Sequence, residues 1–176
     1  MENEHALALD LLSRFNRPHQ VDEHHGEFLY VLYLLLRKAQ PVVSTWARQR
    51  AFECGADSKL AWRVVAVSEG ALMQIARPKE GEKLQRGHFF GRRERFNAMF
   101  DASREPWDKK ELLEFFFEHD ACALVTGTEN GRHGVNHWST LHAVPAHIFS
   151  STGFDVRVRK RVDLPWVLEQ VQKIGL

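Results

Sequence analysis

The chain has 176 residues, 44% of them hydrophobic, which is enough to bury the core of one domain. Its 24 Lys and Arg nearly balance 23 Asp and Glu, so a surface made uniformly basic for nucleic acid or acidic lipid is excluded. Two cysteines without a CxxC pair exclude a disulfide framework and a cysteine-rich zinc module. The acidic N-terminus and the short apolar runs predict a cytoplasmic protein with no targeting or membrane-spanning segment.

The first half of the chain is predicted to be helical, starting with a short helix over His5 to Phe15. From Glu27 the sequence FLYVLYLLLRKA is apolar nearly all round, which predicts a central core helix packed on several sides. Pro41 is expected to interrupt it before a helical stretch over 43–52. Ser58 is a favourable N-cap for another helix over 59–76. The aromatic residues of these helices are expected to fill the core, namely Tyr30, Tyr33, Trp46 and Trp62.

The second half is predicted to mix helices and strands. Asp108 is a favourable N-cap for a helix whose apolar face packs inward. Phe154, Val156 and Val158 alternate with charged residues, which is typical of a half-buried strand. The other expected elements are helices over 93–100, 109–119 and 164–174 and strands over 121–125 and 142–149.

Together these elements predict an α+β fold in a single domain over residues 1–176. A helical N-terminal part is expected to pack on a small, mostly antiparallel sheet with flanking helices. The helical part is assigned to 1–78 and the mixed part to 84–176. Residues 79–83 lie in the turn-forming sequence PKEGEK and are the candidate hinge.

The segment Thr126 to His147, TGTENGRHGVNHWSTLHAVPAH, holds four of the ten histidines together with Glu129, Asn130 and Arg132. Loops and element ends that carry several proton-transfer or metal-binding groups are where active sites usually lie. We therefore predict that any chemistry of this protein takes place in this segment.

Arg132 and His137 stand as R-x4-H in the sequence RHGVNH. This arrangement resembles the short motif of HEPN-type ribonucleases, in which an Arg and a His act on the RNA backbone at a dimer interface. The resemblance implies that His137 exchanges a proton while Arg132 stabilises charge on the phosphate. His133 and Glu129 are the further catalytic candidates. In that family the motif lies on a helix, whereas Gly131 and its neighbour Gly134 each cost about 1 kcal/mol of helix stability.

A metal site is the second interpretation of the same segment. His133 and His137 would share a helical face at i, i+4, and His142 or His147 could supply a third imidazole, with Glu129 as the base. The spacing matches no HExxH, HxH or HNH pattern. A divalent metal ion is therefore an alternative, and no cofactor is the simpler expectation.

A phosphate-binding loop is the third interpretation. Backbone beside Gly127, Gly131 and Gly134 could form an anion nest after the buried strand, with Asn130 inside it. TENGRHG is faintly similar to the Gly-x-His-Arg loop of the ParB and sulfiredoxin superfamily, although Gly134 stands where the Arg would be. GRRERF over 91–96 has a similarly faint likeness to the arginine motif of that superfamily.

Basic side chains alternate with Phe89, Phe90 and Phe96. Guanidinium groups bind phosphates and aromatic faces stack on unpaired bases, so this stretch could contact nucleic acid. The alternative is a helix start whose Phe residues enter the core while its Arg residues pair with nearby carboxylates. A second basic group over 157–161 would complete a cationic groove beside the histidines. The candidate nucleic-acid ligands are Arg86, His88, Arg92, Arg93, Arg95, Asn130, Arg157 and Arg159.

Two classes of function remain open. The first is a small nucleic-acid-acting enzyme, a ribonuclease or a metal-dependent nuclease, with an Arg/His site in 129–147. The second is a non-catalytic accessory or inhibitory module that binds nucleic acid or a protein partner through its basic surface or its Gly-rich loop. The density of titratable groups slightly favours the enzyme. We expect no membrane association, and a homodimer is compatible with either class.

Overall fold

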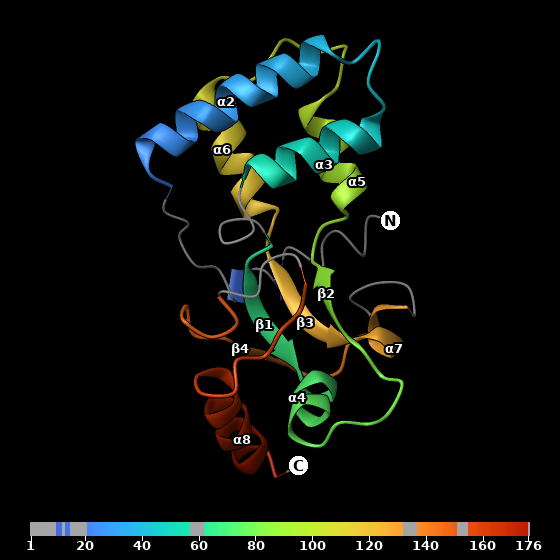
Figure 1. Ribbon diagram of the computed structural model, residues 1–176, viewed down its shortest axis with the longest axis vertical. Coiled ribbons are helices and arrows are strands. Elements are labelled where there is room, and N and C mark those ends of the chain that lie inside the picture. The colour runs from blue at the N-terminus through green and yellow to red at the C-terminus, as the bar shows by residue number, and fades with distance from the viewer. Residues whose placement is uncertain are drawn as a thin grey trace.

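The computed structural model describes residues 10, 11, 13, 14, 21–56, 62–131, 137–150 and 155–175. Helices gather at one end of a four-stranded sheet, and other helices pack at its opposite end (Figure 1). This arrangement confirms the α+β class with a small sheet and flanking helices. The four described residues between 10 and 14 are helical, in agreement with the predicted first helix. No helix among the described residues combines the length and the apolar character that crossing a bilayer requires.

The sheet has the strand order β2-β3-β1-β4. β1 and β3 run parallel in its centre and are buried throughout, whereas each edge strand is antiparallel to its neighbour. Two of the three pairings are thus antiparallel, as expected. Because β1 and β3 are parallel, both end at the same edge of the sheet. The strands are β1 (Val64–Ser68), β2 (Leu84–His88), β3 (Cys122–Thr126) and β4 (Leu141–Ala143).

β1 corrects the prediction of one long helix over 59–76. Val64–Ser68, with the sequence VVAVS, is a central strand, and the helix α4 (Glu69–Ala76) begins only after it. Three β-branched valines fit a buried, pleated strand better than a helix. Ser68 marks the true start, because its Oγ accepts a hydrogen bond from the Ala71 amide at 3.0 Å. β2 has no counterpart among the predicted elements, because its sequence LQRGH lacks an apolar alternation.

Two predicted strands after residue 140 are also corrected. The strand expected over 142–149 is limited to Leu141–Ala143, and residues 155–159 form no strand. Val156 and Val158 pack against the apolar cluster that includes the helix α8 (Asp163–Lys173), so their alternation reflects contact with a helix. The C-terminal helix itself is confirmed.

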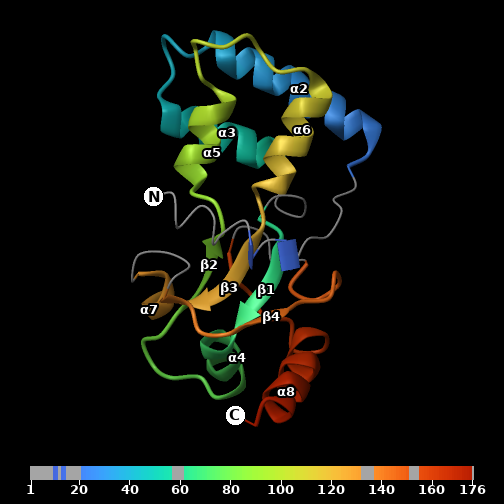
Figure 2. The same cartoon turned by 180° about the vertical axis from the view of Figure 1, so that it is seen from behind.

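The helical end consists of four helices, which Figures 1 and 2 show from opposite sides. Two of them precede the expected hinge at 79–83 and two follow it, so this end draws on both parts of the chain. Asp108 caps the last of them with a capping box, in which Glu111 bonds back to the Asp108 amide. The four are α2 (Glu23–Lys38), α3 (Thr45–Gly55), α5 (Arg92–Met99) and α6 (Lys109–Glu118).

α2 is not the central core helix that its sequence predicts. Only Gly26, Leu29 and Tyr33 are buried, and the side chains on the outer side of α2 remain about half exposed. Trp46 on α3 was expected in the core and is instead 74% exposed. The apolar side chains of α2 and α3 therefore extend beyond the faces that the four-helix core covers.

Gly87 on β2 allows close approach of Trp138, whose ring lies across it. A Cβ at Gly87 would overlap Cζ2 of the Trp138 indole, which also packs on Phe89. We expect Gly87→Ala to lower the free energy of unfolding by about 1–3 kcal/mol, measured by urea denaturation. The matched control is Gly91→Ala, whose Cβ would meet only the mobile end of Glu94, at 3.1 Å. Equal loss in both variants would contradict the prediction.

Candidate functional site

The predicted catalytic segment starts at the edge of the sheet where β1 and β3 end. The short helix α7 (Gly127–Asn130) follows β3 directly, and Thr126 Oγ1 caps it by accepting from the Glu129 amide at 3.2 Å. His137 lies on the surface. Arg132 and His133 lie outside the described residues, so the R-x4-H pair stays a prediction.

Hydrogen bonds to the Glu129 side chain connect three segments of the chain at this edge. Its carboxylate accepts hydrogen bonds from Ser68 Oγ at 2.8 Å, the Thr126 amide at 2.8 Å, and the Ser139 amide and Oγ at 3.0 and 2.5 Å. Burial acts to raise the pKa of Glu129, but these bonds outweigh it and hold the pKa below its ordinary value. A Cβ at Gly70 would stand 2.9 Å from both carboxylate oxygens. Such a fixed, ionised carboxylate suits a structural role better than proton transfer.

The histidines are not gathered around a common point in the described structure. His142 Nε2 lies 3.2 Å from Glu69 Oε1, in a partly buried pair. Within the described ranges, no three His, Cys, Asp or Glu side chains form a group that could hold a metal ion. Among the expected metal ligands, neither His137 nor His142 therefore belongs to such a group within the described residues. His133 lies outside the described residues.

The described part of the glycine-rich loop, which ends at Gly131, offers phosphate few donors, and Gly134 lies outside the described residues. The amides of Gly127, Thr128 and Gly131 already donate to oxygens of the chain itself. Asn130 Nδ2 donates to Gln85 Oε1 at 2.8 Å. An anion nest needs amides that point to an open space, and these amides are used inside the protein.

Arg92 and Arg95 neutralise buried carboxylates. Arg95 Nη2 lies 3.3 Å from Glu53 Oε1 and its Nη1 contacts Asp120, while Arg92 Nε donates to Glu53 Oε1 at 2.9 Å. Arg95, Glu53 and Asp120 are at most 3% exposed. Burial raises the pKa of Asp120, and Arg95 opposes this effect. The four charges connect α3 and α5 with the start of β3, so the expected phosphate ligand Arg95 is part of the core.

His88 and Arg86 extend from β2 beside this ion network. Burial, followed by the charges of Arg95, Arg92 and Arg86, lowers the pKa of His88 well below 6.5. The imidazole is therefore neutral at physiological pH and its Nε2 is buried. Burial also lowers the pKa of the half-buried Arg86. A neutral, enclosed histidine adds no charge that would attract phosphate.

The second basic group lies apart from the first. Arg159 is bound to the buried Asp163, with Nη2 and Oδ1 2.6 Å apart, and the exposed Arg157 lies 3.6 Å from Asp155. These residues adjoin α8, whereas α3 and α5 occupy the opposite end of the molecule (Figure 1). The single cationic groove expected from the sequence is thus not formed. Of the predicted arginines, Arg93 is exposed and makes no ion pair with a described residue.

A groove between α3 and α5 combines basic and aromatic side chains. Trp46 and Arg50 are one turn apart on α3, and Arg93 and Asn97 are one turn apart on α5, so each pair shares a helix face. Trp46 is 74% exposed. The α3–α5 groove has a volume of about 480 Å³ and is lined by Thr45, Trp46, Gln49, Arg50, Arg92, Arg93 and Asn97.

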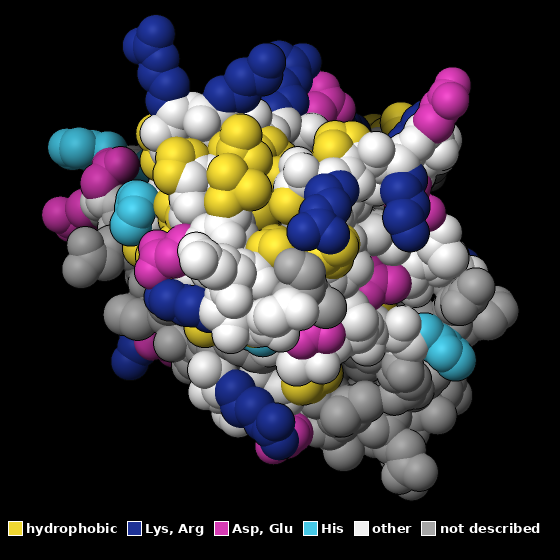
Figure 3. Space-filling view, turned by 90° about the horizontal axis from the view of Figure 1, so that it is seen from below, with side chains coloured by type: hydrophobic (Ala, Val, Ile, Leu, Met, Phe, Trp, Pro, Cys, Tyr) yellow, Lys and Arg dark blue, Asp and Glu magenta, His cyan; other side chains and the backbone are white. Residues whose placement is uncertain are grey.

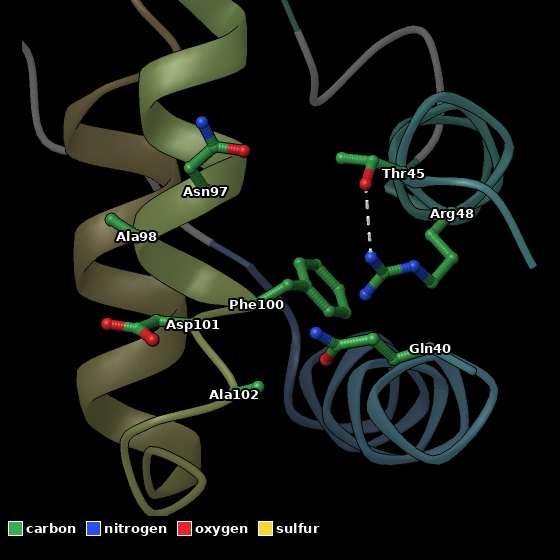
Figure 4. A pocket seen from close by; sticks show the side chains of 8 residues that line it. All are labelled: Gln40, Thr45, Arg48, Asn97, Ala98, Phe100, Asp101 and Ala102. Carbon is green, nitrogen blue, oxygen red and sulfur yellow. Dashed lines mark hydrogen bonds between the residues drawn. The ribbon is translucent and has the colours of Figure 1, made fainter.

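A second cavity adjoins the α3–α5 groove and shares Thr45 and Asn97 with it. Arg48 enters this cavity from α3 (Figure 4). Its Nη2 donates to Thr45 Oγ1 at 3.3 Å, and its guanidinium lies 5.3 Å from the centre of the Phe100 ring. The Arg48 pocket has a volume of about 520 Å³ and is lined by Gln40, Thr45, Arg48, Asn97, Ala98, Phe100, Asp101 and Ala102.

A third cavity, of about 620 Å³, lies at the other end of the molecule, between α4, β2 and α8. Figure 3 looks at this end and shows apolar side chains gathered beside basic and acidic ones. Its apolar lining includes Ile75, Leu84 and Val158, and charges of both signs surround it. It therefore has neither the single charge sign nor the exposed indole of the α3–α5 groove.

Known proteins offer no guide to the site, because no family model, curated protein or solved structure matched the chain. The sequence-based prediction did include Arg92 and Arg93 but missed Trp46, Arg48 and Arg50. The sequence did contain one signal for this face of α3. Ser44 is a favourable N-cap, and in the helix that follows it Trp46 and Arg50 stand at i, i+4 on the same face.

Proposed function

We propose that the protein binds single-stranded nucleic acid in the α3–α5 groove. The observation that carries the proposal is the 74% exposed indole of Trp46 in a groove lined by three arginines. Bases stack on exposed aromatic faces, and guanidinium groups bind phosphates. Arg93 supplies charge that no described carboxylate neutralises, whereas Arg92 is bound to Glu53.

The nearly neutral net charge of the chain and the small size of the basic area favour binding of a short single-stranded segment of nucleic acid over a long duplex. A net charge of +1 requires that any nucleic-acid contact be local. Gln49 and Asn97 also line the groove, and their amide groups can exchange hydrogen bonds with the Watson–Crick edges of bases, which are accessible only when the bases are unpaired. These features support binding rather than cleavage as the role of this groove.

Trp46→Ala is the first test of this proposal. Loss of the stacking face is expected to weaken binding of a short, fluorescein-labelled, single-stranded oligonucleotide by about 1–3 kcal/mol, measured by fluorescence anisotropy. Arg157→Ala is the matched control, because Arg157 is exposed near α8 at the opposite end. Equal affinity of the Trp46 variant and the wild type would contradict the proposal.

The same titrations test the ionic contribution of Arg93. Arg93→Ala is expected to reduce the slope of log K against log salt concentration by about 0.7, because one phosphate contact is lost. Arg157→Ala should leave the slope unchanged. A slope that responds to Arg157 and not to Arg93 would place the contact elsewhere on the surface.

Cleavage by Arg132 and His137 is a separate proposal, favoured by the exposure of His137. Incubation of labelled RNA with wild type and with His137→Ala separates the two activities. If wild type binds the RNA and leaves it intact, the result supports the binding module. If wild type produces cleavage products and His137→Ala does not, the result supports a ribonuclease.

A further inference from the structure

We propose that the Arg48 pocket holds a phosphate monoester, the charged group at the end of a nucleic-acid strand that occupies the adjoining groove. The inference rests on the proposed function for the source of the phosphate. The pocket itself rests on separate observations, namely the burial of Arg48, its unused donors and the position of α3.

Arg48 is a buried cation without a counter-charge in the described structure. It is 4% exposed, and its Nε and Nη1 are enclosed and lack a hydrogen-bond partner. Arg95, on the facing helix α5, is similarly buried but is paired with both Glu53 and Asp120. Because an uncompensated buried charge is strongly destabilising, a guanidinium of this kind is explained by an anion that binds there.

The geometry around Arg48 prepares the pocket for an anion. Arg48 stands in the first turn of α3, where the helix dipole favours negative charge, and Ser44 caps this helix end. Thr45 Oγ1 orients the guanidinium, and the side chain of Gln40 reaches toward it from the other wall (Figure 4). Asp101 points away from Arg48 in the same view.

A phosphate monoester fits this arrangement best. It carries about −1.5 to −2 charge at neutral pH and three free oxygens, so it satisfies a planar guanidinium and neighbouring polar groups together. The pocket shares Thr45 and Asn97 with the α3–α5 groove. A strand that stacks on Trp46 can therefore extend its terminal phosphate past Thr45 to Arg48.

The test compares oligonucleotides of one sequence with a 5′-phosphate, a 3′-phosphate or neither, each labelled at the end away from the phosphate. Wild type is expected to bind one phosphorylated form about tenfold or more tightly than the unphosphorylated one. Arg48→Met should abolish this preference and melt no lower than wild type, because it replaces an unpaired buried cation by an apolar chain. Asp101→Asn should strengthen the preference, since it removes a negative charge from the pocket wall. Arg157→Ala should keep it.

The outcomes separate the pocket from the groove. Equal affinity for all three forms, with binding still weakened by Trp46→Ala, would overturn the pocket and leave the proposed function standing. If no oligonucleotide binds, the proposed function fails, and the Arg48 pocket is then tested separately by thermal denaturation in inorganic phosphate. A rise in melting temperature relative to chloride at equal ionic strength, absent in Arg48→Met, would support a pocket for free phosphate, and no rise would overturn it. If Arg48→Met does not fold, Thr45→Val replaces it as the variant expected to weaken the preference.

Discussion

Replacement of Arg95 by Met is expected to lower the free energy of unfolding by about 3–5 kcal/mol. Arg95 is 3% exposed and lies between Glu53 and Asp120, which are both buried. Without its guanidinium, Asp120 loses its ion pair and keeps the hydrogen bond from the Trp62 amide, with the charges of Arg63 and Arg86 nearby. Glu53 keeps Arg92 as its ion-pair partner among the described residues. Met preserves much of the packing on Phe116, so the loss reports the ionic contacts.

Thermal and chemical denaturation of three variants measure this effect. Arg93→Met changes an exposed arginine of the same helix and is expected to alter stability by no more than about 0.5 kcal/mol. The double variant Asp120→Asn with Arg95→Met also removes the charge of one of the two buried carboxylates that lose Arg95 as a partner. It should therefore recover part of the lost stability. An Arg95 variant as stable as the Arg93 variant would contradict the importance of this network.

Glu129→Gln is expected to lower the free energy of unfolding by about 1–3 kcal/mol at neutral pH, after allowance for solvent screening of a half-exposed group. Glutamine places an NH2 group where the carboxylate accepts from Ser68, Thr126 and Ser139, so at least one donor faces another donor.

The pH dependence of this difference has a definite sign. The pKa of Glu129 is lower in the folded protein than its ordinary value, so the ionised carboxylate stabilises the fold above the unfolded-state pKa. This contribution is lost as the pH falls through the folded-state pKa. The gap between wild type and Glu129→Gln should therefore close in acid, while the exposed control Glu80→Gln should show no such change. A gap that is constant across this pH range would contradict the prediction.

The elements that could be predicted from the sequence are those whose local signals agree with their packing. Asp108 combines an N-cap with Glu111 in a capping box, and the helix after it has one continuous apolar face. The strand Cys122–Thr126 is apolar up to Val125, is buried throughout and lies in the centre of the sheet. In both cases the long-range contacts reinforce what the local sequence favours.

Other elements depend on contacts between distant parts of the chain. Val64–Ser68 becomes a strand because β3 and β4 flank it, and its valines could be assigned to a helix only when those partners were ignored. The apolar sequence of α2 does not reveal how few neighbours cover it. Arg95 cannot be recognised as buried from its neighbours, since Glu53 and Asp120 are far from it in sequence.

The candidate site shows the same division. Arg92 and Arg93 could be predicted as part of a basic area, because arginines and aromatic residues alternate near them in the sequence. The facing residues Trp46 and Arg50 come from α3, so only the fold brings the two helices together. The Arg48 pocket depends further on Gln40 and Phe100, and no short motif contains all of these residues.

Chemical-shift mapping by NMR tests the proposed function most directly. Amides of isotope-labelled protein are followed during titration with a short single-stranded oligonucleotide. The proposal predicts that the largest shifts fall on residues 45–50 of α3 and 92–97 of α5, together with the Trp46 indole. Largest shifts at residues 137–147 or 155–161, or no shifts at all, would contradict binding in the α3–α5 groove.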